Sequence, residues 1–282
     1  MIELRKALSI GREELMKEGI KNSFLESKLL IKDILSISDE DLALSKNLFL
    51  TDNEYKIYRS FLERRKQSEP IAYILNKRDF WKHSFYVNSS TLIPRNDSEI
   101  IIETILKIIP DINSELKFAD LGTGSGCLII SILNEYKYSE GIGIDNSKDA
   151  IKVAEKNKNI LFNKERLILE LGDFSLLETA EFEVIICNPP YVNKNNIRNL
   201  QKDILEYEPY QALFADEGGF IHYKRIIHNL NKNYKCGQKV FFEIGIGQSE
   251  VVTNLLKNND FKIVEMTNDI NGIPRCIAAE RI

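Results

Sequence analysis

Residues 116–136 have the sequence LKFADLGTGSGCLIISILNEY, in which an apolar run is followed by three closely spaced glycines and then by a second apolar run. Gly122, Gly124 and Gly126 allow the backbone to turn tightly and to approach a ligand that a Cβ atom would repel. We therefore expect a strand over 116–121, a nucleotide-binding type of loop, and a helix over 127–136. Such a unit is typical of a doubly wound α/β sheet.

The alternation of strand-like and helix-like segments continues along the chain. Strands are expected at 141–144, 167–171, 182–187 and 240–244, and helices at 98–109, 148–158 and 220–230. Because parallel strands need crossover connections, this order predicts a doubly wound, Rossmann-like sheet. The last two strands, 261–266 and 276–279, are joined by a short turn, so we expect a terminal antiparallel hairpin. Class I methyltransferase sheets end in this way, and dehydrogenase sheets ordinarily do not.

The first 80 residues have the pattern of amphipathic helices. Two sequences, Ser23 with Glu26 and Thr51 with Glu54, predict capping boxes at helix starts. We expect a helical domain over 1–80 that docks a substrate, a hairpin or linker over 81–97, and an α/β domain over 98–282. A stabilising extension without a recognition role fits the helical part nearly as well.

The overall composition narrows the class of protein. The chain has 282 residues and a net charge of −4, which gives it no general attraction to nucleic acid phosphates. The apolar runs are shorter than the roughly 18 residues that a membrane span needs, so we expect no membrane span. The charged N-terminus does not have the apolar core of a signal peptide, so we expect none. The four cysteines and three histidines lack the spacing of metal ligands. We expect a cytoplasmic, metal-free protein with reduced cysteines.

The glycine loop and two later strand ends predict a cofactor site. The loop consists of Gly122, Thr123, Gly124, Ser125 and Gly126. A dinucleotide pattern needs a third glycine at position 127, where Cys127 stands. Asp145 ends the next strand and can accept hydrogen bonds from ribose hydroxyls, although a helix cap is an alternative role. Asp173 ends the third strand, and Phe174 beside it can stack on a purine or belong to the core. The set favours S-adenosylmethionine, with S-adenosylhomocysteine as its product.

The tetrapeptide Asn188-Pro189-Pro190-Tyr191 follows the fourth strand, at the edge where open α/β sheets bind ligands. Two prolines stiffen the loop and remove two backbone donors. The acceptors that remain are the Asn188 side-chain oxygen and the Pro189 carbonyl, and two acceptors suit the two N–H bonds of a planar –NH₂ group. Tyr191 offers an aromatic face for that group. We therefore interpret 98–282 as a methyltransferase domain with Asn188, Pro189 and Tyr191 as catalytic residues and the whole tetrapeptide as the substrate site.

The tetrapeptide alone does not distinguish a protein glutamine amide from the exocyclic amine of adenine or cytosine. A methyltransferase for adenine N6 in DNA or RNA would flip or unstack its base and would normally carry a basic region. The helical part is nearly neutral, with 16 basic and 14 acidic residues up to Lys82. We therefore expect no direct nucleic acid partner and keep the adenine enzyme as the alternative. A non-catalytic cofactor-binding module and a dehydrogenase fit the motifs less well.

A set of short motifs along nearly the whole chain resembles the HemK-type release factor glutamine methyltransferases. The matching segments are 69–75, 80–81, 92–95, 120–127, 188–191, 208–209, 242–245 and Gln248. The resemblance implies that the substrate is the glutamine of the Gly-Gly-Gln loop of class 1 peptide chain release factors. It also implies that Gly122–Gly126, Asp145, Phe174 and Asn188 contact the cofactor, and that the N-terminal helices dock on the release factor. A ribosomal protein glutamine remains a second possible acceptor.

The chain departs from the family's pattern in three places, and the one at Asn146 and Lys148, where the family usually has Ile and Pro, has no functional meaning that we can assign. After Arg95 the family usually has a second proline and then an acid-Thr-Glu run, whereas this chain has Asn96-Asp97-Ser98-Glu99. The family often has Trp where Phe174 stands. The first change loosens the segment and the second leaves a smaller stacking face, and neither removes a group that methyl transfer requires.

Overall fold

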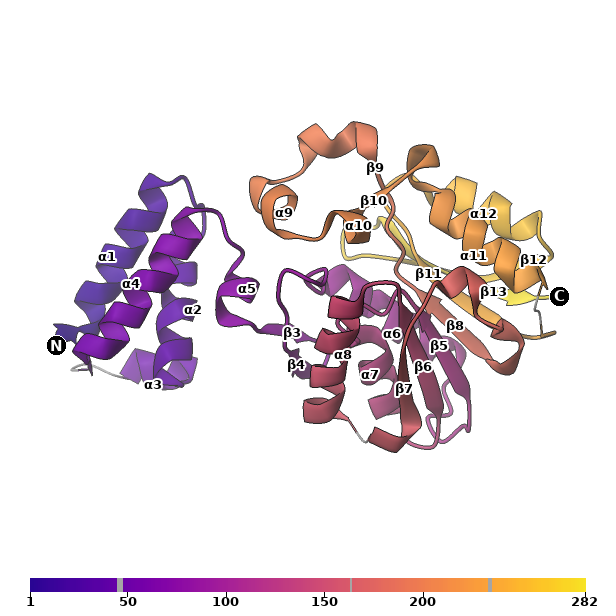
Figure 1. The fold of residues 1–282 in the computed structure, drawn as a ribbon, viewed down its shortest axis with the longest axis horizontal. Helices are drawn as coiled ribbons and strands as arrows, with labels where there is room; N and C mark the ends of the chain where they lie inside the picture. Colours follow the sequence, from indigo (N-terminus) through magenta and orange to yellow (C-terminus); the bar gives the residue numbers. More distant parts are fainter. Residues whose placement is uncertain (45–47, 163, 233–234) are drawn as a thin grey trace. The chain divides into compact units, whose positions relative to one another are not determined.

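The computed structural model describes residues 1–44, 48–162, 164–232 and 235–282. The chain forms two compact units (Figure 1). The first consists of Met1–Lys77 and Gln201–Tyr207, and the second of Arg78–Leu200 and Glu208–Ile282. From the sequence we expected domain boundaries at residues 80 and 97. In the structure the chain passes from the first compact unit to the second between Lys77 and Arg78. The short segment 201–207, which belongs to the first unit, has no counterpart in the expected partition.

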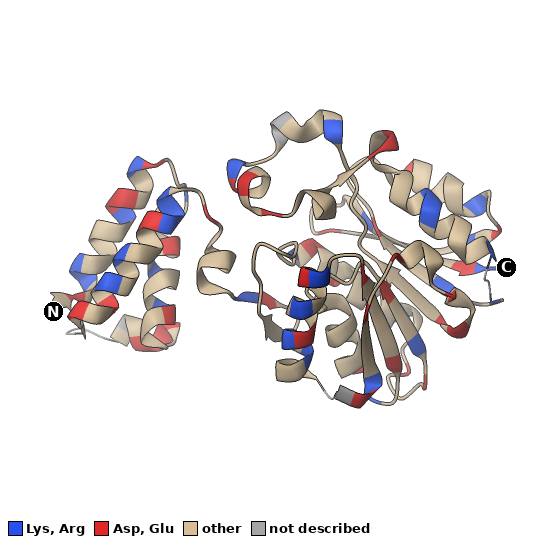
Figure 2. Cartoon of the chain, viewed as in Figure 1, with Lys and Arg blue, Asp and Glu red and all other residues tan. Residues whose placement is uncertain are grey.

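The first unit is a helical bundle with one small antiparallel strand pair. Its elements are α1 (Leu4–Lys17), α2 (Ser23–Leu35), α3 (Asp39–Leu44), α4 (Asp52–Lys66), α5 (Ile71–Leu75), α9 (Lys202–Tyr207), β1 (Ile2–Glu3) and β2 (Phe49–Leu50). Helices α1, α2 and α4 pack against one another around buried apolar side chains such as Leu15, Leu30 and Leu62. Charges of both signs alternate along these helices, as Figure 2 shows.

One of the two predicted capping boxes is present. Thr51 accepts a hydrogen bond from the Glu54 amide at 3.2 Å, and the Glu54 carboxylate accepts from the Thr51 amide at 2.7 Å. The box predicted at Ser23 is wrong, because Ser23 is already the first residue of α2 and makes no cap bond. Glu26 instead pairs with Arg65, whose Nε lies 2.6 Å from its carboxylate. The guanidinium, a stronger partner than a backbone amide, takes the carboxylate away from the helix start.

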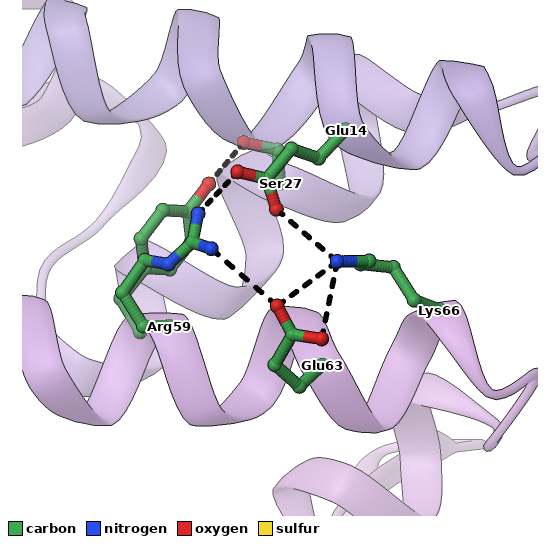
Figure 3. A network of polar contacts seen from close by, with 6 residues as sticks. Glu14, Ser27, Arg59, Glu63 and Lys66 are labelled. Carbon is green, nitrogen blue, oxygen red and sulfur yellow. Dashed lines mark hydrogen bonds and ion pairs between the residues drawn. The ribbon is translucent and has the colours of Figure 1, made fainter.

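A polar network connects the three main helices of this unit (Figure 3). Ser27 of α2 and Tyr58 of α4 share a buried hydrogen bond of 2.6 Å, and burial raises the pKa of Tyr58 to about 12. Arg59 of α4 bridges Glu14 of α1 and, at 3.4 Å, Glu63 on its own helix. These contacts join α2 to α4 and α1 to α4 through groups with directional hydrogen bonds.

The second unit contains a sheet of seven strands in the order β12-β13-β11-β8-β5-β6-β7. The strands are β5 (Lys117–Leu121), β6 (Glu140–Asp145), β7 (Leu167–Leu171), β8 (Val184–Cys187), β11 (Lys239–Glu243), β12 (Phe261–Asn268) and β13 (Pro274–Arg281). The first five are parallel, and β13 runs antiparallel to both β11 and β12. This confirms the predicted Rossmann-like class I methyltransferase sheet with its terminal hairpin.

Helices cover both faces of the sheet (Figure 1). On one side, α6 (Glu99–Ile108), α7 (Cys127–Glu135) and α8 (Lys148–Leu161) pack over a core that includes Phe118 and Phe241. On the other side, α11 (Ile221–Lys232) and α12 (Ser249–Lys257) pack over a core that includes Ile185 and Phe242. Alternate side chains of β11 therefore enter opposite cores, as the period of two in a strand requires.

For residues 81–97 we expected a hairpin or a linker, and a hairpin covers Arg78–Phe85. It consists of β3 (Arg78–Phe80) and β4 (His83–Phe85), and the chain reverses at Trp81, whose φ is 53°. Asn88–Thr91 forms a turn in the loop that follows, with the Ser90 amide donating to the Asn88 side chain at 2.9 Å. The long segment that follows β8 includes β9 (Val192–Asn193), α10 (Tyr210–Leu213) and β10 (Phe214–Ala215), and β9 and β10 pair in parallel. Across the described ranges, every helix is too short or too polar to cross a membrane.

Candidate active site

A cavity of about 400 Å³ opens at the carboxyl ends of the central parallel strands. Its wall combines the loop after β5, the ends of β6 and β8, the loop that precedes α6, and the start of α10. Of the predicted site residues, the wall includes Gly122, Thr123, Gly124, Ser125, Asp145, Phe174, Asn188, Pro189 and Pro190. The structure therefore brings most of the predicted cofactor and substrate residues together at one edge of the sheet.

The glycine loop is held by backbone bonds to the neighbouring strand. The amides of Gly122 and Thr123 both donate to the Ile144 carbonyl, at 2.8 and 3.0 Å. Gly122 and Gly124 have φ values of 81° and 55°, which glycine adopts without strain. Gly126 also has a positive φ, 79°, and it has a second role, since a Cβ there would lie 3.0 Å from Ile130 Cδ1 and 3.4 Å from Ala154 Cβ. Gly126 thus permits close packing of α7 and α8 behind the wall.

Asp145 joins the glycine loop to the start of α8. Its carboxylate accepts from the Gly124 amide and from the Ser147 amide, each at 2.9 Å. The alternative role as a helix cap belongs to Ser147, whose hydroxyl accepts from the Ala150 amide at 3.2 Å. Burial raises the pKa of Asp145 and the backbone bonds oppose that rise. Each carboxylate oxygen has more than one lone pair, so Asp145 can still accept from the two hydroxyls of a ribose.

Asp173 and Phe174 differ in their surroundings. The Phe174 ring lies in the cavity wall, in an edge-on contact with the His222 ring and with 6.1 Å between centroids. Asp173 makes an ion pair with Arg225 at 2.8 Å and accepts from the Ser175 amide at 2.9 Å. Its carboxylate therefore has protein partners on both sides, and a contact with the cofactor adenine stays a prediction.

The tetrapeptide places Asn188, Pro189 and Pro190 in the wall and Tyr191 behind it. The Asn188 amide nitrogen donates to Ser98 Oγ at 3.1 Å, so the amide oxygen is the end that remains for a ligand. The Tyr191 hydroxyl donates to Glu243 Oε1 at 3.1 Å, and the negative charge of Glu243 raises the pKa of Tyr191. Stacking of a substrate amide on Tyr191 stays a prediction.

Several groups that shape the cavity carried no role in the sequence interpretation. Ser98 binds Asn188, and Glu243 binds Tyr191 from the end of β11. The Gln248 amide supports the loop by donating to the Tyr191 carbonyl at 3.0 Å. His222 lies in the wall, and its buried Nδ1 lacks a hydrogen-bond partner within the described part of the chain. Glu243 belongs to the segment 242–245 that resembles the family, so the sequence offered a reason to consider it. His222 and Ser98 stand in no motif, so the sequence offered no reason to assign them to the site.

Comparison with known proteins gives two matches to family models. The PrmC N-terminal domain matches residues 6–75. A methyltransferase domain matches residues 112–264. The two matched ranges fall in the helical part and in the α/β part of the chain, respectively.

Two curated relatives and one solved structure indicate how far the similarity extends. The release factor glutamine methyltransferase of Clostridium acetobutylicum is 33% identical over 99% of both chains. The bifunctional methyltransferase of Rickettsia felis is 33% identical over 97% of this chain, which spans 57% of that protein's length. The hMettl16 catalytic domain, solved with the MAT2A 3'UTR hairpin 6, superposes with a TM-score of 0.56 at 15% identity, over 83% of this chain and 84% of that one. That last likeness is one of fold.

Proposed function

The chain belongs to the family of release factor glutamine methyltransferases, and we propose that it methylates the side-chain amide of the glutamine in the Gly-Gly-Gln loop of class 1 peptide chain release factors. The observation that carries this proposal is the orientation of Asn188. Its amide nitrogen is bound by Ser98, so its oxygen is the acceptor at the cavity wall, next to the carbonyl of the rigid Pro189.

The residues of the cavity fit the cofactor that this reaction requires. At Gly122 and Gly124 of the loop the backbone itself lines the cavity, without side chains that would keep a ligand away. Two backbone amides hold the Asp145 carboxylate, whose oxygens retain lone pairs that can accept from ribose hydroxyls. Phe174 adds an aromatic face suited to adenine. When bound here, S-adenosylmethionine would supply an electrophilic methyl group. We assign Gly122, Thr123, Gly124, Ser125, Asp145, Phe174 and Asn188 to its binding, with Asp173 and Gly126 as supports of the wall.

The protein's contribution to the reaction is to bind and orient a weak nucleophile. An amide nitrogen is a poor nucleophile because its lone pair is delocalised into the carbonyl. Two acceptors, Asn188 Oδ1 and the Pro189 carbonyl, can hold both N–H bonds of the glutamine amide and draw electron density toward the nitrogen. Positioning of this kind is worth effective molarities of up to about 10⁵–10⁸ M for well-oriented groups. No strong base is needed, because the nitrogen becomes acidic as it is methylated.

A labelling experiment tests the substrate. The protein is incubated with labelled S-adenosylmethionine and, in separate reactions, with a class 1 release factor, its Gln→Ala loop variant, and DNA. We expect label on the unmodified release factor alone. Label on DNA, or equal label on the Gln→Ala variant, would overturn the proposal and favour the adenine-N6 alternative or another acceptor.

A second experiment tests the acceptor role of Asn188. Asn188→Ala is expected to abolish transfer while the cofactor dissociation constant, measured by calorimetry, changes far less. Asn113→Ala, at an exposed position, serves as the matched control and should transfer normally. An active Asn188→Ala variant would show that the two-acceptor arrangement is not how the amide is held.

A further inference from the structure

Phe174 lies on the connection between β7 and β8, which is built from two single turns of 3₁₀ helix, η3 (Phe174–Leu176) and η4 (Thr179–Glu181). The connections that contain α7 and α8 have α-helices, whose backbone carbonyls accept mostly from amides of the same helix. A single 3₁₀ turn satisfies fewer of its own carbonyls, so such a segment needs donors from other elements. The position of Phe174 therefore depends on side chains that reach this connection from elsewhere.

Asn229 of α11 holds both ends of the turn η3. Its side-chain amide donates from Nδ2 to the Phe174 carbonyl at 3.1 Å and to the Leu177 carbonyl at 3.0 Å. Phe174 is the first residue of the turn, and Leu177 is its C-cap. Because this amide is buried, water does not readily replace the two bonds when they are lost, and their removal costs more than the loss of exposed bonds would.

Two other side chains of α11 contact the same turn. His222 and Arg225 precede Asn229 by seven and four positions, so the three residues share one face of the helix. The His222 ring meets the edge of the Phe174 ring, and the Arg225 guanidinium lies 5.8 Å from the centroid of that ring and pairs with Asp173. The Arg225 side chain is 43% exposed, so water screens its contacts, whereas Asn229 is only 5% exposed. Asn229 is therefore the main tie between the turn and α11.

We propose that Asn229 is a positioning residue for S-adenosylmethionine and that it acts by holding the Phe174 ring in the cavity wall. This inference rests on the proposed function, which assigns Phe174 to the adenine. Phe174 lines the cavity, and Asn229 contributes nothing to that wall, so Asn229 acts on the cofactor through the turn alone. An aromatic ring stacks well only within a narrow range of distances and angles. A displaced turn should therefore weaken the binding of the adenine and leave the methyl transfer itself nearly unaltered.

Gln238 provides a matched control on the same connection. Its Nε2 donates to the Thr179 carbonyl at 2.6 Å and to the Phe182 carbonyl at 2.8 Å, and its side chain is buried. Gln238 thus makes at η4 the same pair of bonds that Asn229 makes at η3, but the two residues that it holds do not line the cavity. Comparison of the two amides separates the positioning of Phe174 from a general loss of stability.

Calorimetry with S-adenosylmethionine compares Asn229→Asp with Gln238→Glu, two isosteres that remove the amide donors. Asn229→Asp is expected to raise the dissociation constant about 10-fold, inside the range for the loss of stacking on one base. Its kcat at saturating cofactor should change less than about threefold, because the variant loses binding that is uniform along the reaction. Gln238→Glu should keep the dissociation constant within about twofold, less than the worth of one hydrogen bond. Asn229→Ala and Gln238→Ala repeat the comparison without a buried charge. An unchanged dissociation constant in both Asn229 variants, or an equal rise in the Gln238 variants, would overturn the proposal.

A double-mutant cycle tests whether Asn229 acts through Phe174. Phe174→Ala should itself raise the dissociation constant roughly 10- to 100-fold. Asn229→Ala added to Phe174→Ala should raise it by less than about twofold more, since the ring that Asn229 holds is already gone. Full multiplication of the two single effects would contradict the proposed route.

The binding measurements need no release factor, so their outcome does not depend on the proposed substrate. An unchanged dissociation constant in Phe174→Ala would refute the assignment of that ring to the adenine, and this inference with it. A rise in Phe174→Ala without a rise in either Asn229 variant would overturn the inference alone and leave the proposed cofactor site standing.

Discussion

Glu208 and Arg95 form an ion pair with 2.5 Å between Oε1 and Nη2, and the Glu208 side chain is only 1% exposed. The second carboxylate oxygen of Glu208 accepts from the Ile93 amide at 3.1 Å. One carboxylate thus ties the loop before α6 to the segment that begins α10, and both segments belong to the cavity wall. The pair fixes the distance between two walls that are 113 residues apart in sequence.

Arg95→Ala should therefore destabilise the second unit more than the loss of a surface charge would. Removing one partner of a buried pair leaves an uncompensated charge, at a cost of about 3–5 kcal/mol, and the 34% exposure of Arg95 places the expected value at the low end. Urea unfolding measures the difference. Lys107→Ala, whose partner Glu265 is more exposed, is the control and should cost under about 1 kcal/mol. Equal costs for the two variants would show that the Glu208 carboxylate is well solvated.

Gly11→Ala is expected to disrupt the helical unit. A Cβ atom at Gly11 would lie 1.8 Å from Tyr58 Oη and 2.7 Å from Ser27 Oγ, inside the buried hydrogen bond that joins α2 and α4. Overpacking of this kind typically costs about 1–3 kcal/mol. Tyr58→Phe removes the nearest clashing atom, so the double variant should lose less than the sum of the two single variants in urea unfolding. Strict additivity would mean that the added methyl group does not meet the Tyr58 hydroxyl.

The parallel sheet could be predicted from the sequence because its strands are short apolar runs and three of the crossovers between them, at α7, α8 and α11, have helical periodicity. The exact strands of the hairpin at 78–85 could not be predicted, since each has only three residues and the turn between them uses Trp81 at a positive φ, for which the sequence has no turn signal. Helix α12 was missed because it has nine residues, of which only Val252 and Leu256 are buried.

The sequence predicted those parts of the candidate site whose functional residues are consecutive in the chain. The glycine loop and the tetrapeptide are of this kind, and both reach the cavity. The residues that orient them come from distant segments, such as Ser98 for Asn188 and Glu243 for Tyr191, which are 90 and 52 positions away. A single sequence contains no record of such pairs. Their roles follow only from distances and from the count of donors and acceptors.

The four cysteines should differ sharply in reactivity. Cys236 is exposed, whereas burial raises the pKa of Cys127 and of Cys276 to about 12 and raises that of Cys187 as well. Since the thiolate is the nucleophile, Cys187 and Cys276, which are buried, and Cys127, which is half-buried with a raised pKa, should react slowly at neutral pH. An Ellman titration of the folded protein is expected to show one fast equivalent, and Cys236→Ser should show none. Fast reaction of two or more thiols would indicate that the cavity side of Cys127 opens to solvent.

The proposed docking role of the helical unit predicts a defect that depends on the size of the substrate. Phe24 and Leu25, 54% and 52% exposed at the start of α2, adjoin Leu29 one turn later and form an apolar surface. Phe24→Ser with Leu25→Ser should raise KM for a release factor several-fold and leave kcat/KM for a short Gly-Gly-Gln peptide unchanged. Ile270→Ser, fully exposed near the C-terminus, is the matched control and should alter neither. Equal effects on both substrates would assign these residues to stability instead.

Asp120 should make the free energy of unfolding depend on pH in a direction that can be predicted. It is buried at the end of β5, where it accepts from Thr123 Oγ1 at 2.7 Å, and burial raises its pKa to about 7. A carboxyl group with a raised pKa binds its proton more tightly in the folded state. Its favourable contribution is therefore complete below the unfolded pKa near 4 and is lost as the pH rises toward 7.

Asp120→Asn keeps an acceptor for Thr123 and removes the titration. The free energy of unfolding of the variant, relative to the unmodified protein, should rise between pH 5 and pH 8 by a few kcal/mol, on the scale of about 1.4 kcal/mol per pKa unit. Asp149→Asn, at an exposed position, is the control and should show a far smaller change. A difference that falls with pH would mean that Asp120 is ionised and stabilised in the folded protein, and that the cavity floor beneath the glycine loop carries a negative charge at neutral pH.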